Sequence, residues 1–590
     1  MLPNHSNQLK KKLFVILIFV CLVSCSPFLK KAENSPSLHI HDIQGCSHIS
    51  DYDGHQVHDI TGIVTSKTTK GFYMQDDQPD DLVCSSEAIF VFTNSYSKVM
   101  PGDKVLVSGL VNEFFPGDVE SNNLSITEIE DPEVKIVAHN HSIPEATVIG
   151  DGGREIPDSV IDNDCLTSFD VDDDGIDFFE SMESMIVRIN SGVVVGARNA
   201  YNEVVIVPES AIHENLVSKN GALIQTESDP NPERIILNMN DSNMEKINVG
   251  AKLIHPVQGI LDYSYGNFKV NTFGKVDFNN SEFQITPIEN DGNLLSVASY
   301  NVNNLSRFDE KAKFRNLARI IVKTMDSPDV VILHEIMDDS GVEDDGTVTA
   351  ELTISRILEV ISEAGGPVYS YIQIDPKDGN DGGISGGNIR SVILYRSDKQ
   401  ISVAEDDLPA LLNSNPDVIE STSASFSGTR KPLAVLFNKG EKQLMLIAVH
   451  LTSRNADSPL FGSYQPIIRP EEVKRIHQAE LIHDFVDKFH KMNPDIRIVV
   501  AGDLNDDPWS KTLLTLTSTT MNDLATIVPP NERYSFILDG NAIQLDYILT
   551  EKPISSRDQF FIFHTNSLYD YLLKFSDHDP VLALIDLNDH

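Results

Sequence analysis

Positive charge is scarce in this chain. Its 590 residues include 88 Asp and Glu but only 46 Lys and Arg, so the formal net charge is −42 at pH 7. Proteins that hold polyanions through bulk electrostatics carry an excess of positive charge, and that class is excluded. A phosphate-bearing ligand would have to meet local positive charge from a metal ion or from a few placed arginines. A chain this acidic also suits surroundings rich in cations, which screen the repulsion between its own charges.

The N-terminal segment lacks an apolar run long enough to span a bilayer. The run over residues 13–23 falls short of the roughly 20 residues that a spanning helix needs. It follows a run of lysines, which is the pattern of a cleaved export signal. Leu22 to Cys25 resemble a bacterial lipobox, although an ordinary secretory signal with a chance cysteine is the alternative. We predict a lipoprotein signal peptide over residues 1–24 and lipidation of Cys25. The protein would then be lipid-anchored to the bacterial cell envelope (the outer membrane if the source is Gram-negative) or extracellular.

Cysteine is also rare, with 5 in the chain. Cys21 lies in the predicted signal and Cys25 at the predicted lipid site, so Cys46, Cys84 and Cys165 remain. An odd number excludes a complete disulfide framework. One bridge such as Cys46–Cys84 is compatible with an oxidising compartment. None of the three has neighbours that indicate a nucleophile.

Two common ligand motifs are missing. The stretch "GGISGGN" lacks the Lys-Ser/Thr pair of a nucleotide P-loop. The chain also lacks the Cys/His spacing of a structural zinc site. Five histidines do crowd near the N-terminus, at positions 39, 41, 48, 55 and 58. They could form a metal-binding tract, but scattered loop histidines are the favoured interpretation.

Three folded parts are predicted after a polar tether over residues 25–42. Residues 43–145 show short β-like runs with period-2 alternation, and "GDKVLVSGLV" is typical of a strand in an OB barrel, which often binds oligonucleotides. A barrel that serves only as a spacer is the alternative. Residues 146–290 predict a second β-rich domain, which could be another OB-like barrel. Over residues 291–590 strands alternate with helical stretches, the pattern of an α/β domain.

Polar residues in the α/β part fall where apolar strands end. Strand ends collect at one edge of a sheet, so such residues can converge from distant positions. Each alone could cap a strand or form an Asx turn, but an ordered series indicates a site. The residues are Asn301, Glu335, His450, Asp503, Asn505, Asp546, Asp577 and His578.

The ordered motifs resemble the endonuclease/exonuclease/phosphatase superfamily, whose best known member is pancreatic-type deoxyribonuclease. They are an Asn after the first strand, then "LHE", "VHL", "GDLN", "LDY" and "SDHDP", and they cover about Leu294 to Leu587. Segments such as "GGNIRSVILYR" and "HLTSRNADSPLFG" are similar to bacterial extracellular nucleases, in which OB-like domains precede the catalytic domain. The resemblance implies a multidomain chain with all-β OB-like barrels, followed by a four-layer α/β sandwich of two sheets covered by helices.

The resemblance also implies a divalent metal. Asn301, Glu335 and Asp577 would bind it, and their oxygen donors suit Mg²⁺ first, with Mn²⁺ or Ca²⁺ as alternatives. Asp503 and Asn505 would hold the attacking water and a phosphate oxygen.

Further roles follow from the same resemblance. His578, oriented by Asp546, would act as a general base or as a charged stabiliser. His450 would stabilise the phosphorane-like state or assist the leaving oxygen. The residues expected to contact the scissile phosphate are Asn388, Arg390 and Arg430.

Two departures from the family pattern stand out. Position 334 is His where the family usually has Gln, and strand alternation places His334 away from the metal. The "GGNIR" segment replaces a Glu that pairs with the histidine matching His450 in some deoxyribonucleases, so the partner of His450 stays open.

The sequence therefore predicts a metal-dependent, exported nuclease that hydrolyses phosphodiester bonds of nucleic acid, with DNA favoured over RNA. One alternative is a related enzyme acting on a non-nucleic phosphate ester such as an inositol phosphate or sphingomyelin, which the negative charge favours. Another is an inactive surface binding protein. The expected partners are nucleic acid and, through the lipid anchor, a membrane, with no obligate protein partner.

Overall fold

The computed structural model begins to describe the chain just before its first helix. The predicted signal peptide and Cys25 lie outside the described residues, as does most of the tether predicted over 25–42. Helix α1 (Ile40–Gln44) begins inside the end of that tether, and its Ile40 is fully buried, so the packed part begins earlier than predicted. No helix among the described residues combines the length and apolarity needed to cross a bilayer. The described ranges are 38–213, 216–239, 245–290, 292–405, 409, 411–420 and 422–588.

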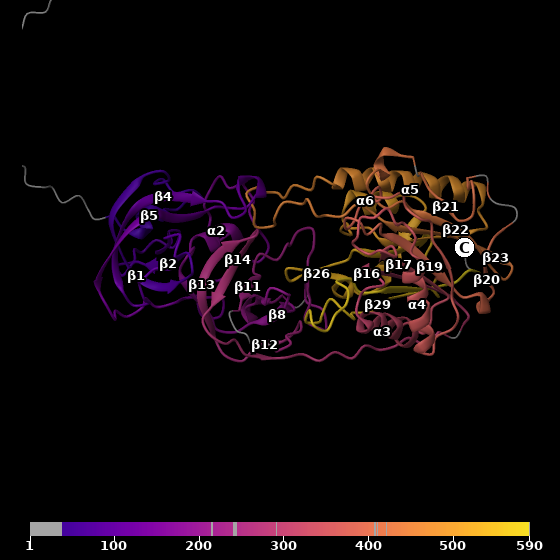
Figure 1. The fold of residues 1–590 in the computed structure, drawn as a ribbon, viewed down its shortest axis with the longest axis horizontal. Coiled ribbons are helices and arrows are strands. Elements are labelled where there is room, and N and C mark those ends of the chain that lie inside the picture. The colour runs from indigo at the N-terminus through magenta and orange to yellow at the C-terminus, as the bar shows by residue number, and fades with distance from the viewer. Residues whose placement is uncertain are drawn as a thin grey trace, which may run out of the picture. The chain divides into compact units, whose positions relative to one another are not determined.

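The first part is a closed barrel with the strand order β1-β2-β3-β5-β4 (Figure 1). Its strands are β1 (Gln56–Lys67), β2 (Gly71–Gln75), β3 (Ala88–Phe92), β4 (Lys104–Phe114) and β5 (Ile126–Ala138). Buried and partly exposed residues alternate along most of β4, as expected for a strand with one face toward an apolar interior. A disulfide joins Cys46, just after α1, to Cys84 in the β2–β3 connection, while Cys165 is free and exposed. Closure joins β4 back to β1, so neither strand is left as an open edge.

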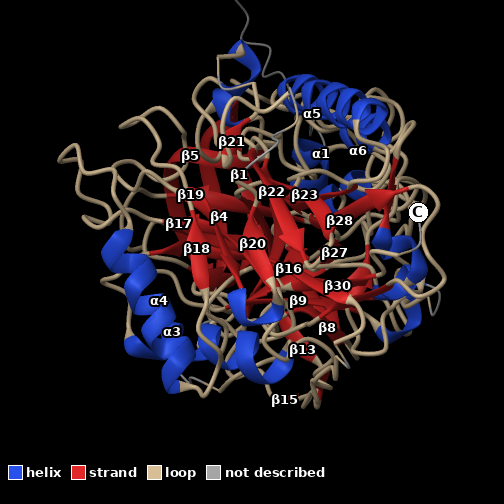
Figure 2. Cartoon of the chain, turned by 90° about the vertical axis from the view of Figure 1, so that its right-hand side faces the viewer, coloured by secondary structure: helices blue, strands red, loops and turns tan. Residues whose placement is uncertain are grey.

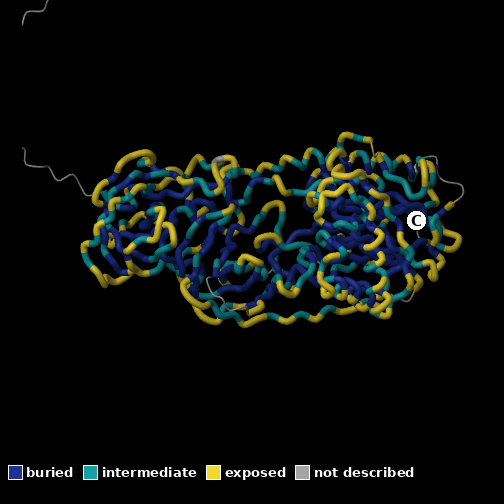
Figure 3. Tube along the Cα trace, viewed as in Figure 1, coloured by how far each residue is buried: buried dark blue, intermediate teal, exposed yellow. Residues whose placement is uncertain are grey.

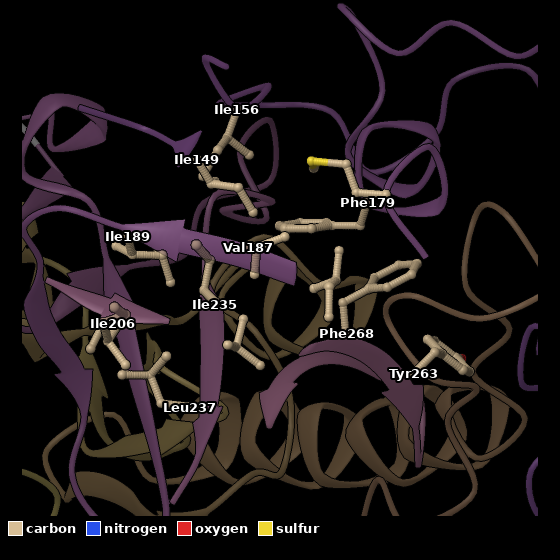
Figure 4. Close-up of a cluster of buried hydrophobic side chains, with 14 of the residues drawn as sticks. Ile149, Ile156, Phe179, Val187, Ile189, Ile206, Ile235, Leu237, Tyr263 and Phe268 are labelled. Carbon is tan, nitrogen blue, oxygen red and sulfur yellow. The ribbon is translucent and has the colours of Figure 1, made fainter. Parts of the chain in front are cut away.

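In the described part of residues 146–290, nine strands form one open sheet rather than a second closed barrel. The order is β15-β12-β8-β9-β11-β14-β13-β7-β6. Phe179 of α2 (Gly175–Glu180) stacks on Phe268, with ring centroids 5.1 Å apart, within the core that Figure 4 shows. The strands are β6 (Thr147–Ile149), β7 (Ile186–Ile189), β8 (Val193–Gly196), β9 (Glu203–Val207), β11 (Ile235–Asn238), β12 (Lys252–Leu253), β13 (Val257–Ser264), β14 (Asn267–Thr272) and β15 (Phe278–Asn279).

The described residues after 292 form two sheets with helices on their outer faces. The six-stranded sheet has the order β18-β19-β17-β16-β30-β29, and the seven-stranded sheet has the order β20-β22-β23-β24-β28-β25, with β21 paired to β22. The first contains β16 (Leu295–Leu305), β17 (Val330–Ile336), β18 (Ser370–Ile372), β19 (Arg390–Tyr395), β29 (Gln559–Ile562) and β30 (Val581–Ile585). The second contains β20 (Ile401–Val403), β21 (Asp417–Val418), β22 (Leu433–Lys439), β23 (Lys442–His450), β24 (Arg497–Asp503), β25 (Met521–Asp523) and β28 (Asp546–Glu551).

The layers follow from the three apolar cores of this region. One core lies between the sheets and contains Val297 and Ala501. A second packs α3 (Lys311–Arg319) and α4 (Glu351–Glu363) on the six-stranded sheet, and a third packs α5 (Glu472–Met492) and α6 (Lys511–Leu516) on the other. Figure 2 shows the two helix pairs on opposite sides of the strands. The strands are covered on both faces and are mostly buried (Figure 3), which explains their nearly continuous apolar runs. This is the four-layer sandwich that the sequence predicts.

A small sheet connects the middle part to the sandwich. Strand β10 (Leu223–Ile224) pairs in parallel with β27 (Asn541–Ile543), which forms a hairpin with β26 (Phe536–Leu538). The amide of Asn231 also donates to Asn541 Oδ1 at 2.6 Å. The regions predicted over residues 146–290 and 291–590 are therefore joined by backbone pairing between their strands.

Glu233, just before β11, is a buried acid. The free energy of unfolding should decrease as the pH rises, because ionisation of this carboxyl group is unfavourable in the folded protein. Burial raises the pKa of its carboxyl group to about 8. The folded state therefore holds a proton that the unfolded state releases near pH 4.5. The contribution of this one group to wild-type stability should fall by up to about 1.4 kcal/mol per pH unit between these two values. We expect Glu233→Gln to raise the melting temperature, and the gain over wild type to grow from pH 5 to pH 8. Thermal unfolding at both pH values measures it, with the exposed Glu227→Gln as control. A gain that does not change with pH would contradict the assignment.

Candidate active site

One amide connects two carboxylates from different sheets. Asn301 on β16 donates through Nδ2 to Glu335 Oε1 at 3.0 Å and to Asp503 Oδ2 at 3.1 Å. Glu335 lies near the end of β17 in one sheet and Asp503 ends β24 in the other. The structure thus brings together three of the predicted strand-end residues at the rim where the sheets meet.

An irregular backbone aims Glu335 at this rim. The β16–β17 register shifts between Asn301 and Leu305, and Glu335 has φ 62°. Left-handed φ is uncommon for a non-glycine residue, and bulges of this kind redirect side chains beside functional sites. The backbone N–H of Asn304 donates to Glu335 Oε2 at 2.9 Å and fixes the carboxylate.

His578 is held between two carboxylates. Its Nδ1 lies 2.8 Å from Asp546 Oδ2, which also accepts a hydrogen bond from Ser535 Oγ at 2.7 Å. Its Nε2 lies 3.8 Å from Asp503 Oδ2. Burial opposes protonation of the ring, but Asp546 and then Asp503 outweigh burial and raise the pKa of His578 well above its usual range. Asp546 therefore fixes the imidazole and favours its protonated form.

His450 has the opposite character. Its Nε2 lies 3.6 Å from Asp503 Oδ2 and 3.8 Å from Glu335 Oε1, too far for hydrogen bonds. Burial, followed by the nearby charge of Arg430, lowers the pKa of His450 well below its usual range. We therefore treat these contacts as those of a neutral ring. His334 lies behind it, bonded to Ser299 and Ser391, and does not line the cavity.

These side chains open onto a cavity of about 590 Å³. Asp577, which is half-buried, and Arg430 also line it. Asn505 lines it too, and its Nδ2 donates to Leu451 O at 3.3 Å. The predicted site residues that line the cavity are Glu335, Arg430, His450, Asp503, Asn505, Asp577 and His578.

The structure places Asn388 and Arg390 outside the lining of this cavity, and their contact with a scissile phosphate stays a prediction. The amide of Asn388 donates to Asp338 Oδ2 at 3.0 Å and to Asp378 Oδ1 at 3.1 Å. Arg390 pairs with Asp375 Oδ1 at 2.7 Å. Acidic residues of the loops thus engage both groups, although Nε of Arg390 is buried without a hydrogen-bond partner.

The sequence did not single out one wall of the cavity. Phe536 lies against His578 with ring centroids 4.9 Å apart, and Leu538 and Ile543 line the same side. All three belong to the β26–β27 hairpin, which pairs with β10 of the middle part. Ser535 was also missed, and the only available signal was its place in "RYSFILDGNAIQLDY", which is similar to bacterial nucleases.

The carboxylates fit a divalent cation. Burial raises the pKa of Glu335, and it raises the pKa of Asp503 to about 6. Among the described residues neither forms an ion pair with Lys or Arg, and the positive groups near them are His578, 3.8 Å from Asp503, and Arg430, which lines the cavity. Glu335, Asp503 and Asp577 offer the hard oxygen donors that such ions prefer. Asn301 meets the first two through its amide nitrogen, which suits a positioning residue, and its predicted role as a ligand stays a prediction.

Two family models match parts of the chain. Residues 298–578 match the Endonuclease/Exonuclease/phosphatase family, and residues 148–287 match a family described as a domain of unknown function (DUF8508). No curated protein matches the chain.

Solved structures that match the chain include three of interest. Truncated Caenorhabditis elegans TDP2 is 16% identical, with 51% of this chain and 99% of that chain covered and a TM-score of 0.34. D. rerio TDP2 complexed with single-strand DNA product is 16% identical, with 49% and 97% covered and a TM-score of 0.33. The human Nocturnin catalytic domain with bound sulfate is 15% identical, with 49% and 93% covered and a TM-score of 0.31. On the family match, residues 298–578 of this chain are a domain of the endonuclease/exonuclease/phosphatase family.

Proposed function

We propose that the protein is a metal-dependent nuclease that hydrolyses phosphodiester bonds, with DNA as its main substrate. One observation carries this proposal. Asp503 Oδ2 lies 3.1 Å from the amide of Asn301, 3.6 Å from Nε2 of His450 and 3.8 Å from Nε2 of His578. An anion, a neutral imidazole and a cationic imidazole thus meet at one point of a cavity.

The two charged groups have complementary tasks. His578 carries its charge because Asp546 fixes it, so its Nε2–H can stabilise the negative charge that develops on the phosphorus oxygens. Asp503, whose pKa is raised to about 6 by burial, is suited to accept a proton from the attacking water near neutral pH. Of the two roles predicted for His578, this arrangement favours the charged stabiliser.

The remaining residues bind and orient. A divalent cation held by Glu335 and Asp577 would neutralise phosphate charge and lower the pKa of water bound to it. Arg430 faces the cavity while its Nη2 donates to Leu451 O at 2.6 Å, which directs the guanidinium toward a phosphate oxygen. His450, being neutral, can donate or accept at the leaving oxygen without adding charge.

The barrel supports nucleic acid over other phosphate esters. Its five strands close in the order β1-β2-β3-β5-β4, and we assign it to the OB type. Tyr96 is exposed on it with the ammonium of Lys67 4.4 Å from the ring centroid, a pair that could stack on a base and meet its phosphate. The high negative charge of the chain favours the alternative of a non-nucleic phosphate ester. The digestion assay described below distinguishes the two substrate classes.

Export and anchoring at Cys25 form part of the proposal. The Cys46–Cys84 bridge supports a compartment outside the cytosol, because structural disulfides persist in oxidising surroundings. Mass spectrometry of the mature N-terminus from the native host tests lipidation.

The decisive assay is digestion of plasmid DNA by the purified protein. We expect cleavage with Mg²⁺, complete loss with EDTA, and recovery when excess Mg²⁺ is added back. RNA, inositol phosphates and sphingomyelin are tested in parallel. Faster turnover of a non-nucleic ester than of DNA would favour the alternative enzyme, and no turnover of any substrate would favour the inactive binding protein.

A further inference from the structure

A second cluster of ligand-type side chains lies on the barrel, far from the catalytic rim in sequence. His39 and His41 flank the start of α1, and Asp76 and Glu87 are the first and last residues of the connection between β2 and β3. The backbone N–H of Asp76 donates to Glu87 O at 2.8 Å, which holds the two acids on neighbouring strands. The fold thus brings together residues that are separated by almost 50 positions.

The four side chains are already paired across α1 and the hairpin. His39 Nδ1 lies 2.8 Å from Asp76 Oδ2, and His41 Nδ1 lies 3.0 Å from Glu87 Oε2. The two imidazoles are parallel, with centroids 5.1 Å apart and planes 1° apart. One ligand atom each from His41, Asp76 and Glu87 all lie within 4.8 Å of one another. These three donors are therefore near enough to share one ion.

The carboxylates of Asp76 and Glu87 are buried, and a buried negative charge is unfavourable unless a positive charge lies beside it. Asp76 and Glu87 are 2% and 7% exposed, and among the described residues Asp76 pairs with His39 and Glu87 pairs with His41. Backbone N–H groups orient them: Gln78 donates to Asp76 Oδ1 at 2.8 Å, and Asp80 donates to Glu87 Oε1 at 2.9 Å. Such outer bonds fix ligands in metal sites.

We propose that His39, His41, Asp76 and Glu87 form a binding site for a divalent transition-metal ion of the zinc class. Imidazole nitrogens combined with carboxylate oxygens are the donors such ions take, often in a tetrahedral set of four. Ions such as Mg²⁺ prefer oxygen alone, so this site differs in kind from the catalytic rim. On binding, the ion replaces the two hydrogen bonds between the imidazoles and the acids, and any imidazole proton leaves to solvent.

The site would act as a clamp at the start of the barrel. Cys46 and Cys84 already tie the end of α1 to the β2–β3 connection, and the ion would tie the start of α1 to both hairpin strands. The other nearby histidines do not join the cluster. His48 pairs with Asp177, and His55 is exposed and contacts the Asp53 carbonyl. The site is therefore specific to two of the five histidines, which the sequence pattern alone could not distinguish.

Calorimetric titration of the purified, disulfide-intact protein with ZnCl₂ at pH 7.5 tests the proposal. A Glu335→Gln/Asp503→Asn background removes competing binding at the catalytic rim. We expect one zinc per chain in that background and a rise in its melting temperature. His41→Ala should weaken zinc binding at least about 100-fold, as loss of a direct ligand must exceed the 10–100-fold effect of an outer-shell change.

His55→Ala is the matched control, because it removes an imidazole from the same region without touching the cluster. Glu87→Gln is the conservative second variant if His41→Ala does not fold, and it should weaken binding by a similar factor. X-ray absorption should show nitrogen and oxygen ligands at about 2.0–2.2 Å. Unchanged zinc affinity in both variants, or zinc that binds only in the presence of Glu335 and Asp503, would overturn the proposal.

Discussion

Replacing His578 with alanine should lower kcat for DNA cleavage by about 10³-fold, with the fold retained. The ring provides the cationic donor nearest to Asp503, and positioned acid–base groups contribute roughly 10²–10⁴-fold. The side chain is buried against Phe536 rather than within a main apolar core, so its loss should cost catalysis more than stability. Initial rates on plasmid DNA at saturating Mg²⁺ measure the effect. His477→Ala, an exposed position on α5, is the matched control and should retain full activity.

The pH profile tells which form of His578 acts. Asp546 raises the pKa of His578, so Asp546→Asn should bring that pKa down while keeping the shape of the site. If the cation is the active form, activity is lost as the pH rises through this pKa, and the alkaline limb moves to lower pH in Asp546→Asn. If the neutral ring acts as a base, the acid limb moves to lower pH instead. Near wild-type activity in His578→Ala would remove the histidine from the mechanism altogether.

The strand-end residues were predictable because their positions depend on a regular feature of the fold. Apolar runs end at the same rim of the sandwich, so a polar residue after each run is placed there regardless of the loops between. Asp503 ends β24 in this way, and because β28 runs antiparallel to β24, its first residue Asp546 lies opposite Asp503 at the same rim. His578 comes just before β30, which likewise runs antiparallel to β16. The expected four layers follow from the same alternation of strands and helices.

Residues on loops were not predictable in the same way. Asn388 and Arg390 have the right chemistry for phosphate, but Asp338, Asp375 and Asp378 engage them, and only the folded loops bring those acids near. In a chain this acidic, a lone basic or amide group is often satisfied internally. A motif therefore identifies the loop better than it identifies what the side chain contacts.

The middle part offered no signal that it supports the catalytic wall. Strand β10 is too short to show a period, and its partner β27 is separated from it by more than 300 positions. Short β runs are compatible both with an open nine-stranded sheet and with a second small barrel. The sequence alone therefore could not distinguish these two folds. The junction between the middle part and the sandwich is recognised only from contacts in the folded structure, such as the pairing of β10 with β27.

Arg198→Met should be the most destabilising single change at this junction, costing about 3–5 kcal/mol of unfolding free energy. Arg198, just after β8, contacts Asp570 with Nε at 2.8 Å from Oδ2 and Nη2 at 3.2 Å from Oδ1, and both side chains are almost fully buried. Removing one member of a buried pair leaves the other charge without a partner, which is the costly case. Chemical denaturation measures it. Lys252→Met is the matched control, because its pair with Glu209 is 59% and 46% exposed and should contribute less than about 1 kcal/mol.

The same substitution should also affect catalysis, because Asp570 anchors the segment that leads to His578. Asp570 accepts a hydrogen bond from Ile247 N at 2.9 Å, and upstream in this segment Asn566 Nδ2 donates to His578 O at 2.7 Å. A double-mutant cycle with Asp570→Leu separates the pair from its surroundings, since removal of both charges should cost less than removal of Arg198 alone. If Arg198→Met costs no more than Lys252→Met, the buried bridge does not hold the junction. If stability falls but kcat is unchanged under folded conditions, the middle part supports the fold without positioning the catalytic histidine.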